Sequence, residues 1–351
     1  MSTFDLNKLI RSNIIKLKPY SSARSEFKGN AEVFLDANEN PFDTGLNRYP
    51  DPLQWKVKAQ IADLKGIAVG NIFLGNGSDE VIDLLVRIFC EPGEDHIITL
   101  PPTYGMYQVS ADIANVKIRS MQLTTEFQPD VNKILAAANV HSKILFICSP
   151  NNPTGNNIKT ELIRALVADF PGIVAIDEAY IDFSSQASCI ELLSEFPNLV
   201  VMQTFSKAWG LAGIRLGIAF ASTEIISYLN KVKPPYNINQ LTQTAALEAL
   251  KNKAQQEQMI QTIIGQRALL QQYLISLEFV ERIYPSDANF LLVKVQDPKG
   301  TYQYLVEQGI IVRDRSNVAL CEGCLRITVG TPEENEKLVQ ALVERFILNE
   351  N

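Results

Sequence analysis

Histidine and cysteine are scarce in this sequence of 351 residues. It contains two histidines, His96 and His141, and five cysteines, which are Cys90, Cys148, Cys189, Cys321 and Cys324. An odd number of cysteines in a long chain without a secretory signal favours reduced thiols over a disulfide framework. Cys321 and Cys324 form a CxxC pair, but a structural zinc site needs two more ligands, and both histidines lie far away in the sequence. We therefore expect no metal site and interpret the pair as two thiols in a turn.

Long apolar runs are also absent, since none approaches the ~20 residues that a membrane-spanning helix needs. The N-terminal segment carries scattered charges and no continuous apolar stretch, which argues against a secretory signal. With 32 basic and 39 acidic residues, the net charge is −7. Such a balance opposes non-specific binding to nucleic acid or to an anionic membrane. We expect a cytoplasmic protein that binds neither.

The middle of the chain alternates short apolar runs with helical patterns. The runs are apolar at nearly every position, as in strands buried on both faces of a parallel sheet, and they cover residues 97–100, 143–148, 173–176, 199–203 and 216–221. Helical stretches such as residues 159–170 separate them. This alternation predicts an α/β domain with a mostly parallel central sheet.

The pattern changes near residue 239, where one long helical region, residues 240–277, leads into separate β segments and a final helix. Thr331 as N-cap, Pro332 at the first position and Glu334 in a capping box mark the start of that last helix. Because a single core stops growing at ~250–300 residues, a second domain is expected. We predict an N-terminal arm (1–25), a large domain (45–238) and a smaller α+β domain (26–44 and 239–351).

Polar clusters follow three neighbouring predicted strands. The strand at 143–148 runs into SPNNPTG, the strand at 173–176 into DEAY, and the strand at 199–203 into TFSKAWGLAGIRLG. Alone, these are ordinary turn chemistry, a helix cap and a surface lysine. Ligand sites of open α/β sheets lie outside the carboxyl ends of the strands, so three such clusters together predict one site.

The order NNPTG, DEAY, SKAWGLAGIR resembles the fold-type I pyridoxal-phosphate enzymes, and among them the class I and II aminotransferases. The resemblance runs over nearly the whole chain. It implies that Lys207 carries the cofactor covalently and also moves the proton, and that Asp177 faces the ring nitrogen. It further implies that Asn152 and Tyr180 donate hydrogen bonds to the ring oxygen. A cofactor lysine must be partly deprotonated, which desolvation or nearby positive charge achieves.

The segment GNGSDEVIDLLVRIF reads as a glycine-rich turn that opens an amphipathic helix. Backbone N–H groups at such a start favour a phosphate, although a plain capped helix remains an alternative. The glycines do not form GxGxxG, so dinucleotide binding is not indicated. We expect backbone contacts from Ser78 and Asp79, with charge from Arg215 and hydroxyl groups from Thr204 and Ser206.

Two tyrosines match the family pattern. Tyr104 in PPTYGMY corresponds to the ring that stacks on the cofactor, and Tyr49 in LNRYPDP to the tyrosine that reaches the phosphate of the partner subunit. The resemblance therefore implies a homodimer in which Tyr49 completes the partner's site. Core packing is the alternative for either tyrosine.

The ends of the chain narrow the resemblance. LKPYSSAR, LDANENPF, LNRYPDP, IVRDRS and CLRITVG together look like the histidinol-phosphate aminotransferases. This implies that Arg326 grips the substrate carboxylate and that either Arg313 or Arg315 lies around the second anion with Tyr20 and Asn40. Guanidinium groups bind carboxylate and phosphate alike, which suits both substrates. The implied reaction is transamination between L-histidinol phosphate and 2-oxoglutarate in histidine biosynthesis.

Three alternatives share the cofactor site. A threonine-phosphate decarboxylase would release carbon dioxide, and an aromatic or aspartate aminotransferase would turn over phosphorylated substrate poorly. A regulator that only senses the cofactor would carry an added DNA-binding segment. The acidic sequence, which begins directly with the arm, disfavours the regulator.

Overall fold

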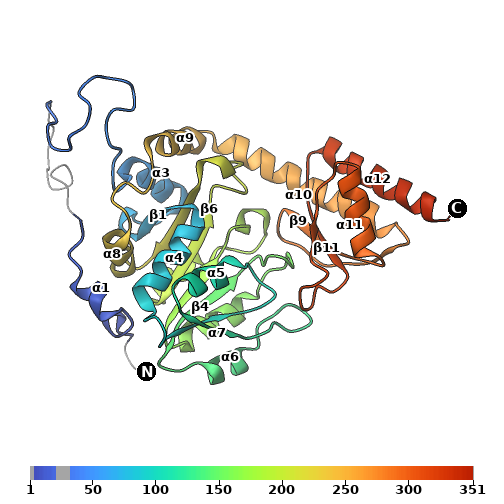
Figure 1. Cartoon of the computed structure of the whole chain (residues 1–351), viewed down its shortest axis with the longest axis horizontal. Coiled ribbons are helices and arrows are strands. Elements are labelled where there is room, and N and C mark those ends of the chain that lie inside the picture. Colours follow the sequence, from blue (N-terminus) through green and yellow to red (C-terminus); the bar gives the residue numbers. More distant parts are fainter. Residues whose placement is uncertain (1–3, 21–31, 351) are drawn as a thin grey trace.

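The computed structural model describes residues 4–20 and 32–350, and its centre is a seven-stranded sheet with the order β1-β7-β6-β5-β4-β2-β3 (Figure 1). The pairs β2–β3, β2–β4, β4–β5 and β5–β6 are parallel, whereas β7 runs antiparallel to β1 and β6. The prediction of a mostly parallel α/β sheet is therefore confirmed. The strands are β1 (Ile72–Asn76), β2 (His96–Thr99), β3 (Lys117–Ser120), β4 (Ser142–Cys148), β5 (Ile173–Asp177), β6 (Leu199–Thr204) and β7 (Leu216–Ala221).

Helices bury both faces of this sheet, which explains why its strands are apolar at successive positions. Along β4, Ile144 and Phe146 enter one apolar cluster, while Leu145 and Ile147 enter the cluster on the other face. The first face is covered by α4 (Gly77–Phe89), α5 (Met106–Ile113) and α8 (Thr223–Val232). The other face is covered by α3 (Trp55–Lys65), α6 (Val131–Ala137), α7 (Thr160–Asp169) and α9 (Gln240–Lys251).

A second, antiparallel sheet has the order β10-β11-β9-β8. Its elements are β8 (Val280–Ile283), β9 (Phe290–Val295), β10 (Arg313–Asp314), β11 (Cys324–Thr328) and the helices α10 (Lys253–Ile275), α11 (Pro298–Glu307) and α12 (Pro332–Glu350). The capping box expected before α12 forms: the Thr331 amide donates to Glu334 Oε2 at 2.8 Å, and the Glu334 amide donates to Thr331 Oγ1 at 3.2 Å. This end of the molecule lies on the right in Figure 1.

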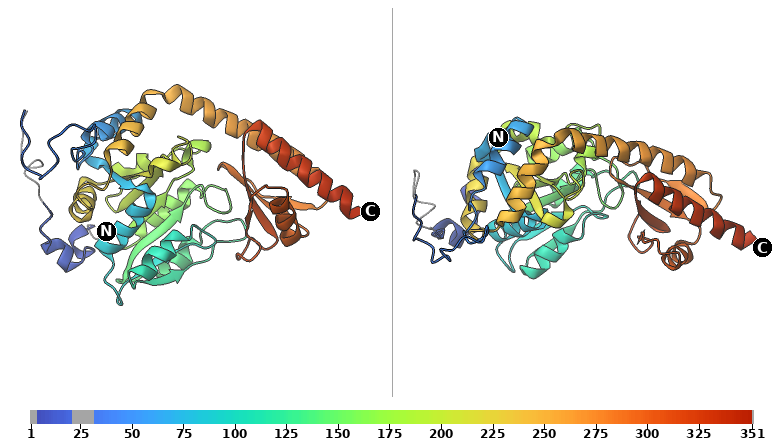
Figure 2. Two further views of the ribbon diagram at one scale, coloured as in Figure 1. Left: turned by 45° about the horizontal axis from the view of Figure 1, so that its top comes forward. Right: turned by 90° about the horizontal axis from the view of Figure 1, so that it is seen from above.

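The single helical region expected over 240–277 is wrong, because the helix breaks at Asn252. This residue has φ −105° and ψ 41°, which lies outside the helical region and separates α9 from α10. The Asn252 side-chain amide donates to the Glu248 carbonyl at 3.2 Å, so the side chain satisfies one terminal carbonyl of α9. The break lets α9 stay on the large sheet while α10 runs toward the small one (Figures 1 and 2).

The N-terminal residues lie at the opposite end of the molecule from the small sheet. A 3₁₀ turn (Leu6–Lys8) and α1 (Ser12–Lys16) bury Leu6, Ile10 and Ile14 in the cluster that contains α4 and α8. Residues 32–44 lie beyond the α3 and α9 end of the large sheet in all three views (Figures 1 and 2). The structure therefore does not bring them to the small sheet, and residues 21–31 lie outside the described residues. The division into arm, large and small domain stays a prediction.

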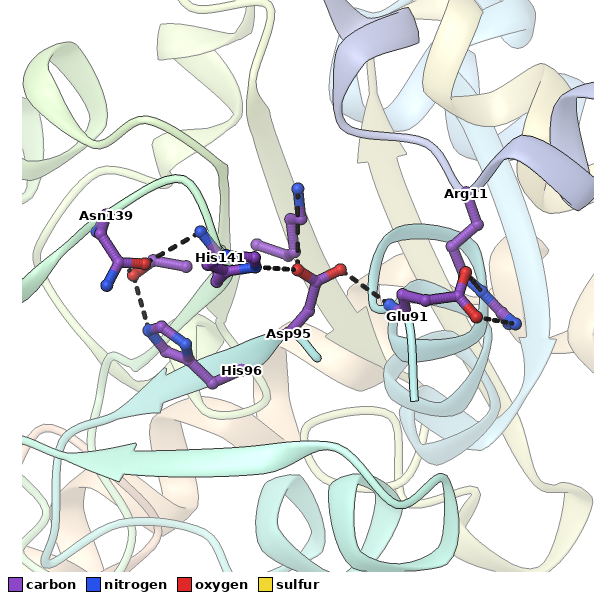
Figure 3. A network of polar contacts seen from close by, with 8 residues as sticks. Arg11, Glu91, Asp95, His96, Asn139 and His141 are labelled. Atoms are coloured by element: carbon purple, nitrogen blue, oxygen red, sulfur yellow. Dashed lines mark hydrogen bonds and ion pairs between the residues drawn. The ribbon is translucent and has the colours of Figure 1, made fainter. Parts of the chain in front are cut away.

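Both histidines belong to a polar network at the amino ends of β2 and β4, shown in Figure 3. His141 Nδ1 lies 3.1 Å from Asp95 Oδ1, and His96 Nε2 lies 2.7 Å from Ser142 Oγ. Arg11 of the N-terminal segment joins through an ion pair of 3.1 Å with Glu91. This network ties the N-terminal segment to the sheet edge that lies opposite the carboxyl ends of β4, β5 and β6.

Residues 4–20 and 32–350 contain no group of three or more histidine, cysteine or acidic side chains placed to hold a metal ion. Within the same ranges, no helix has the length and apolar character to cross a membrane. The five cysteines are free thiols, and the Cys324 amide donates to the Cys321 carbonyl at 3.0 Å, so this pair forms the expected turn.

Candidate active site

A pocket opens at the carboxyl ends of β4, β5 and β6, beside the first turn of α4. Each of the residues predicted to hold a cofactor lines it, except Tyr49. The lining residues are Ser78, Asp79, Tyr104, Cys148, Asn152, Asp177, Ala179, Tyr180, Thr204, Ser206, Lys207, Ala212 and Arg215. Parallel strands bring these residues together because their carboxyl ends meet at the same edge of the sheet.

Lys207 lies in the turn after β6, half-buried, with its Nζ 5.6 Å from the centroid of the Tyr180 ring. Burial lowers its pKa, as does the charge of Arg326, while the Asp177 carboxylate opposes the shift. A lower pKa increases the fraction of neutral amine near neutral pH, which is the form that attacks a carbonyl carbon.

Asp177 is the last residue of β5 and is only 3% exposed. Burial raises the pKa of its carboxyl group, and two hydrogen bonds work against that rise. The Tyr107 hydroxyl donates to Oδ2 at 2.8 Å, and the Ala179 amide donates to Oδ1 at 3.1 Å. A buried carboxylate held in this way can accept a proton or a hydrogen bond from a heterocyclic nitrogen in the pocket.

The two asparagines of the SPNNPTG loop make different contacts. Asn151 is used inside the loop, because its side-chain amide donates to the Pro102 carbonyl at 2.8 Å and to Thr154 Oγ1 at 2.7 Å. Asn152 lines the pocket, and its Oδ1 accepts a hydrogen bond of 2.5 Å from Arg326 Nη1 of β11. With Oδ1 occupied, Asn152 has its NH₂ group left as a donor. This contact also joins the small sheet to the pocket.

The start of α4 and the start of β7 form a tight backbone cradle. The Gly77 amide donates to the Arg215 carbonyl at 2.8 Å. A Cβ atom at Gly217 would lie 2.2 Å from the Ser78 nitrogen, and one at Gly77 would lie 2.6 Å from Arg215 Nη2. Only glycine lets these segments approach so closely, and the approach leaves the Ser78 end of the helix facing the pocket.

The side chain of Asp79 contacts two other residues of the pocket. Asp79 Oδ2 lies 3.5 Å from Arg215 Nη2, and Asp79 Oδ1 accepts a hydrogen bond of 3.1 Å from the Tyr104 hydroxyl. An exposed guanidinium beside a carboxylate gains Coulomb energy, which accounts for this placement. The backbone contacts expected from Ser78 and Asp79 stay a prediction. Thr204 and Ser206 remain at the pocket, linked by a hydrogen bond of 3.0 Å.

The donor set fits pyridoxal phosphate. A helix start, two hydroxyl groups and the Arg215 guanidinium suit a phosphate monoester. The Asp177 carboxylate suits a pyridinium nitrogen, the donors of Asn152 and Tyr180 suit a phenolic oxygen, and the Lys207 amine suits an aldehyde. These groups line a single pocket, and each has a matching group on the cofactor.

A cluster of arginines lies beside this pocket. Arg326 of β11 lies directly opposite Arg313 of β10 in the antiparallel pair, and Arg315 follows in the chain. Burial lowers the pKa of Arg326 and of Arg315, and the neighbouring guanidinium groups add to the effect. In the part of the chain that the structure describes, the Nε atoms of Arg315 and Arg326 are buried without a hydrogen-bond partner. Buried guanidinium groups with unpartnered Nε donors are suited to binding an anion.

Three predicted site residues lie neither in the pocket nor in the arginine cluster beside it. Tyr20 is 72% exposed, Asn40 is exposed, and Tyr49 is 50% exposed and stacks on Tyr236 with 4.4 Å between ring centroids. None of the three lines the pocket.

Sequence reasoning missed Tyr107, whose hydroxyl contacts Asp177. No local signal marks this role, because the contact joins residues that lie 70 positions apart in the chain. It also missed Cys148, the last residue of β4, which lines the pocket.

Comparisons with known proteins agree with this geometry. A family model described as aminotransferase class I and II matches residues 27–342. The chain is 54% identical over 346 residues to histidinol-phosphate aminotransferase of Christiangramia forsetii, covering 98% of this chain and 99% of that one. It is 55% identical over 343 residues to the enzyme of the same name from Cytophaga hutchinsonii, covering 97% and 99%. The solved structure of histidinol-phosphate aminotransferase from Clostridium acetobutylicum has a TM-score of 0.80 at 24% identity, covering 87% of this chain and 92% of that one. The chain belongs to the class I and II aminotransferases.

Proposed function

We propose that this aminotransferase transfers the amino group between L-histidinol phosphate and 2-oxoglutarate, giving imidazole-acetol phosphate and glutamate in histidine biosynthesis. The observation that carries the proposal is identity of 54% over 98% of the chain to a relative named for this activity. The anion site around Arg315 and Arg326 supports it, because each substrate of the pair carries a phosphate or a carboxylate.

The cofactor is pyridoxal phosphate. Arg215, Thr204, Ser206 and the backbone at Ser78 and Asp79 would hold its phosphate. Asp177 would face the ring nitrogen, Asn152 and Tyr180 the ring oxygen, and Tyr104 the ring face. When bound, the cofactor supplies an aldehyde that exchanges onto the substrate amine and an electron-withdrawing ring that stabilises negative charge on carbon.

Lys207 holds the cofactor and then moves a proton. Its amine has a lowered pKa, so it can act as a base that takes the proton from the substrate Cα. The protonated amine can then act as an acid that gives the proton to the cofactor's C4′. Burial raises the pKa of the Asp177 carboxyl group, but the hydrogen bonds from Tyr107 and Ala179 counter that rise. These two donors would favour a carboxylate that faces the ring nitrogen and keeps it protonated.

Substrate recognition falls to the arginine cluster. Arg326 would bind the carboxylate of glutamate or 2-oxoglutarate and, through its hydrogen bond to Asn152, would also orient that amide. Arg315, half-buried with a free Nε, is better placed than the exposed Arg313 for the second anion. Tyr20 and Asn40 stay proposed contacts to that anion.

A homodimer is part of the proposal. Tyr49 is half-exposed and lines a surface pocket together with the exposed apolar side chains of Leu46 and Leu241. A surface of this kind suits a second copy of the chain. Tyr49 would then reach the phosphate of the partner's cofactor. We also propose the cytoplasm as the location, which the five free thiols support.

The test is a panel of amino donors with 2-oxoglutarate, following glutamate formation by the purified enzyme. Histidinol phosphate should be the best donor, with the phenylalanine, tyrosine and aspartate reactions slower by at least about tenfold in kcat/KM. Borohydride reduction should fix the mass of the cofactor to the peptide that contains Lys207.

The control for this test is Lys207→Ala, which should lose both the activity and the mass label. Release of carbon dioxide from threonine phosphate would instead indicate a decarboxylase. Faster turnover of an unphosphorylated amino acid would also sink the proposal. Binding of the cofactor with no turnover of any donor would favour a sensor.

A further inference from the structure

Tyr107 is the largest of the fully buried side chains, and it lies directly beneath the pocket rather than in it. It belongs to α5, which covers the large sheet, and its ring stacks on Phe146 of β4 with 4.7 Å between centroids and 6° between planes. Its hydroxyl reaches Asp177 Oδ2 at 2.8 Å, across 70 residues of sequence. Packing on Phe146 fixes the ring, so the position of the hydroxyl is fixed as well.

A hydrogen bond from a buried phenol to a buried carboxylate orients the carboxylate and favours its ionised form. In the described part of the chain, the Asp177 carboxylate accepts hydrogen bonds from two donors, the Tyr107 hydroxyl and the Ala179 amide. The amide binds Oδ1 and the phenol binds Oδ2, so the two donors together fix the plane of the carboxylate. The Cys148 thiol also lies close to the Tyr107 hydroxyl and donates its own hydrogen to the Pro150 carbonyl at 3.4 Å.

The electrostatic setting makes this contact matter. Burial raises the pKa of Asp177, and the hydrogen bond from Tyr107 is the foremost influence that lowers it again. The titratable groups around this carboxylate are Asp79 on α4, Tyr104 before α5, Tyr107 on α5, Cys148 on β4, Tyr180 after β5 and Lys207 after β6. Of these groups, only Tyr107 donates a hydrogen bond to it.

We propose that Tyr107 is a positioning residue of the amino-transfer reaction, which orients Asp177 against the cofactor ring nitrogen and keeps its carboxylate ionised. The proposal rests on the proposed function only in that Asp177 faces that nitrogen. Tyr107 itself touches neither cofactor nor substrate, since it does not line the pocket. It acts through Asp177.

The first test is Tyr107→Phe, which keeps the ring, its volume and the stack on Phe146. We expect kcat to fall about 10- to 100-fold, the range for losing a hydrogen bond to a charged group, while KM for the amino donor changes less than about twofold. The acid limb of the pH–rate profile should move to higher pH, because a carboxylate that has lost a donor takes up a proton more readily. Unchanged kcat together with an unchanged acid limb would overturn the proposal.

The matched control is Tyr228→Phe. Tyr228 packs against the same apolar cluster as Tyr107 and lies on α8, away from the pocket. It should retain wild-type kcat and pH profile. Equal losses in both variants would show a general packing effect and would count against a role for the Tyr107 hydroxyl.

Two further measurements keep the test decisive. Replacing Tyr107 by 3-fluorotyrosine makes the phenol a stronger donor at nearly the same shape, so the acid limb should move to lower pH even if Tyr107→Phe fails to fold. Cofactor affinity should fall when Tyr107→Phe is made in the wild-type chain, but not when it is made in Asp177→Asn. An equal fall in both backgrounds would mean that Tyr107 does not act through Asp177.

The proposal and the proposed function can fail separately. Failure of the wild-type enzyme to use histidinol phosphate would sink the substrate assignment. The Tyr107 comparison would then be made with whichever donor the wild type does turn over.

Discussion

Desolvation is the main influence on the pKa of both Lys207 and Asp177. Burial lowers the pKa of the lysine and raises that of the aspartate, which in each case favours the neutral form. The charge of each partner opposes the shift of the other. The protonation of the pair therefore depends on its remaining contacts, such as the hydroxyl of Tyr107 and the charge of Arg326.

Lys58 shows desolvation without such a role. It belongs to α3 and is buried, at 2% exposure. Its Nζ lies over the Trp55 ring, 5.9 Å from the ring centroid. No hydrogen bond or ion pair of this amine occurs in residues 4–20 and 32–350. Burial, and then the charge of Lys233, lower its pKa from 10.5 to about 8. The folded state therefore bears a cost whenever Lys58 is protonated.

We predict that Lys58→Met raises the free energy of unfolding by about 1–2 kcal/mol at pH 7, because it removes a buried charge and keeps the volume. Below about pH 8 the folded protein carries the whole cost. Between about 8 and 10.5 the unfolded chain holds a proton that the folded chain has released, so wild-type stability rises with pH. The gain from the variant should therefore shrink over this range and vanish above it.

Melting temperatures of the cofactor-bound enzyme from pH 7 to 10.5 measure this effect. The control is Lys56→Met on the same helix, where the side chain is exposed and the change should lie within about 0.5 kcal/mol at every pH. A lower melting temperature of Lys58→Met at pH 7 would contradict the prediction.

The residues that sequence could predict are those that directly follow strands. Lys207, Asp177 and Asn152 each leave a buried strand at its carboxyl end, and the topology of a parallel sheet then brings them to one edge. Tyr107 and Lys58 each interact with a residue far away in the chain. The Tyr107 hydroxyl donates to Asp177, and the charge of Lys233 lowers the pKa of Lys58. No local pattern records such a contact, so both could be found only in three dimensions.

At the scale of elements, the anion cradle depends on how closely β7 approaches the start of α4. Gly217 of β7 lies against the backbone of Gly77 and Ser78, so a Cβ atom there would meet main-chain atoms that cannot rotate aside. The same approach holds Arg215, whose carbonyl accepts the Gly77 amide. A shift of β7 would therefore move the guanidinium and the helix start together.

We predict that Gly217→Ala destabilises the protein by about 1–3 kcal/mol, as forced overpacking does, and weakens cofactor binding at least about tenfold. Equilibrium dialysis of the cofactor and thermal melting measure the two effects. Gly213→Ala is the matched control, since a Cβ atom there would have nothing within 4 Å. Wild-type cofactor affinity in Gly217→Ala would show that the close approach is not needed.

The same scale explains which elements sequence could predict. β4, β5 and β6 are apolar at successive positions because helices cover both faces, and this is a strong local signal. β3 lies at the edge of the sheet, and its sequence KIRS is exposed at both ends. Because an edge strand is partly polar, no apolar run in the sequence marks it as a strand. The break between α9 and α10 depends on one residue, Asn252, which no periodicity marks.

At the scale of the molecule, the predicted site is divided between two places. The cofactor residues and the arginines lie around the pocket, whereas Tyr20, Asn40 and Tyr49 lie outside it. In a single chain these groups cannot act together. The homodimer that we propose would unite them if the exposed surface around Tyr49 packs against the pocket of a second copy, with Lys207 from one chain and Tyr49 from the other.

Hybrid dimers test this arrangement directly. Lys207→Ala lacks the cofactor lysine, and Tyr49→Ala lacks the proposed contact from the partner, so each variant alone should be strongly impaired. A hybrid of the two contains one site with both defects and one site with neither. Random exchange of equal amounts makes about half of the dimers hybrid, and each has one intact site of two, so about a quarter of wild-type activity should return. Co-expression with two affinity tags isolates the hybrid, which should show about half of wild-type activity. If Lys207 and Tyr49 instead served the same chain's site, each site of the hybrid would keep one defect, and mixing would give only the average of the two variants.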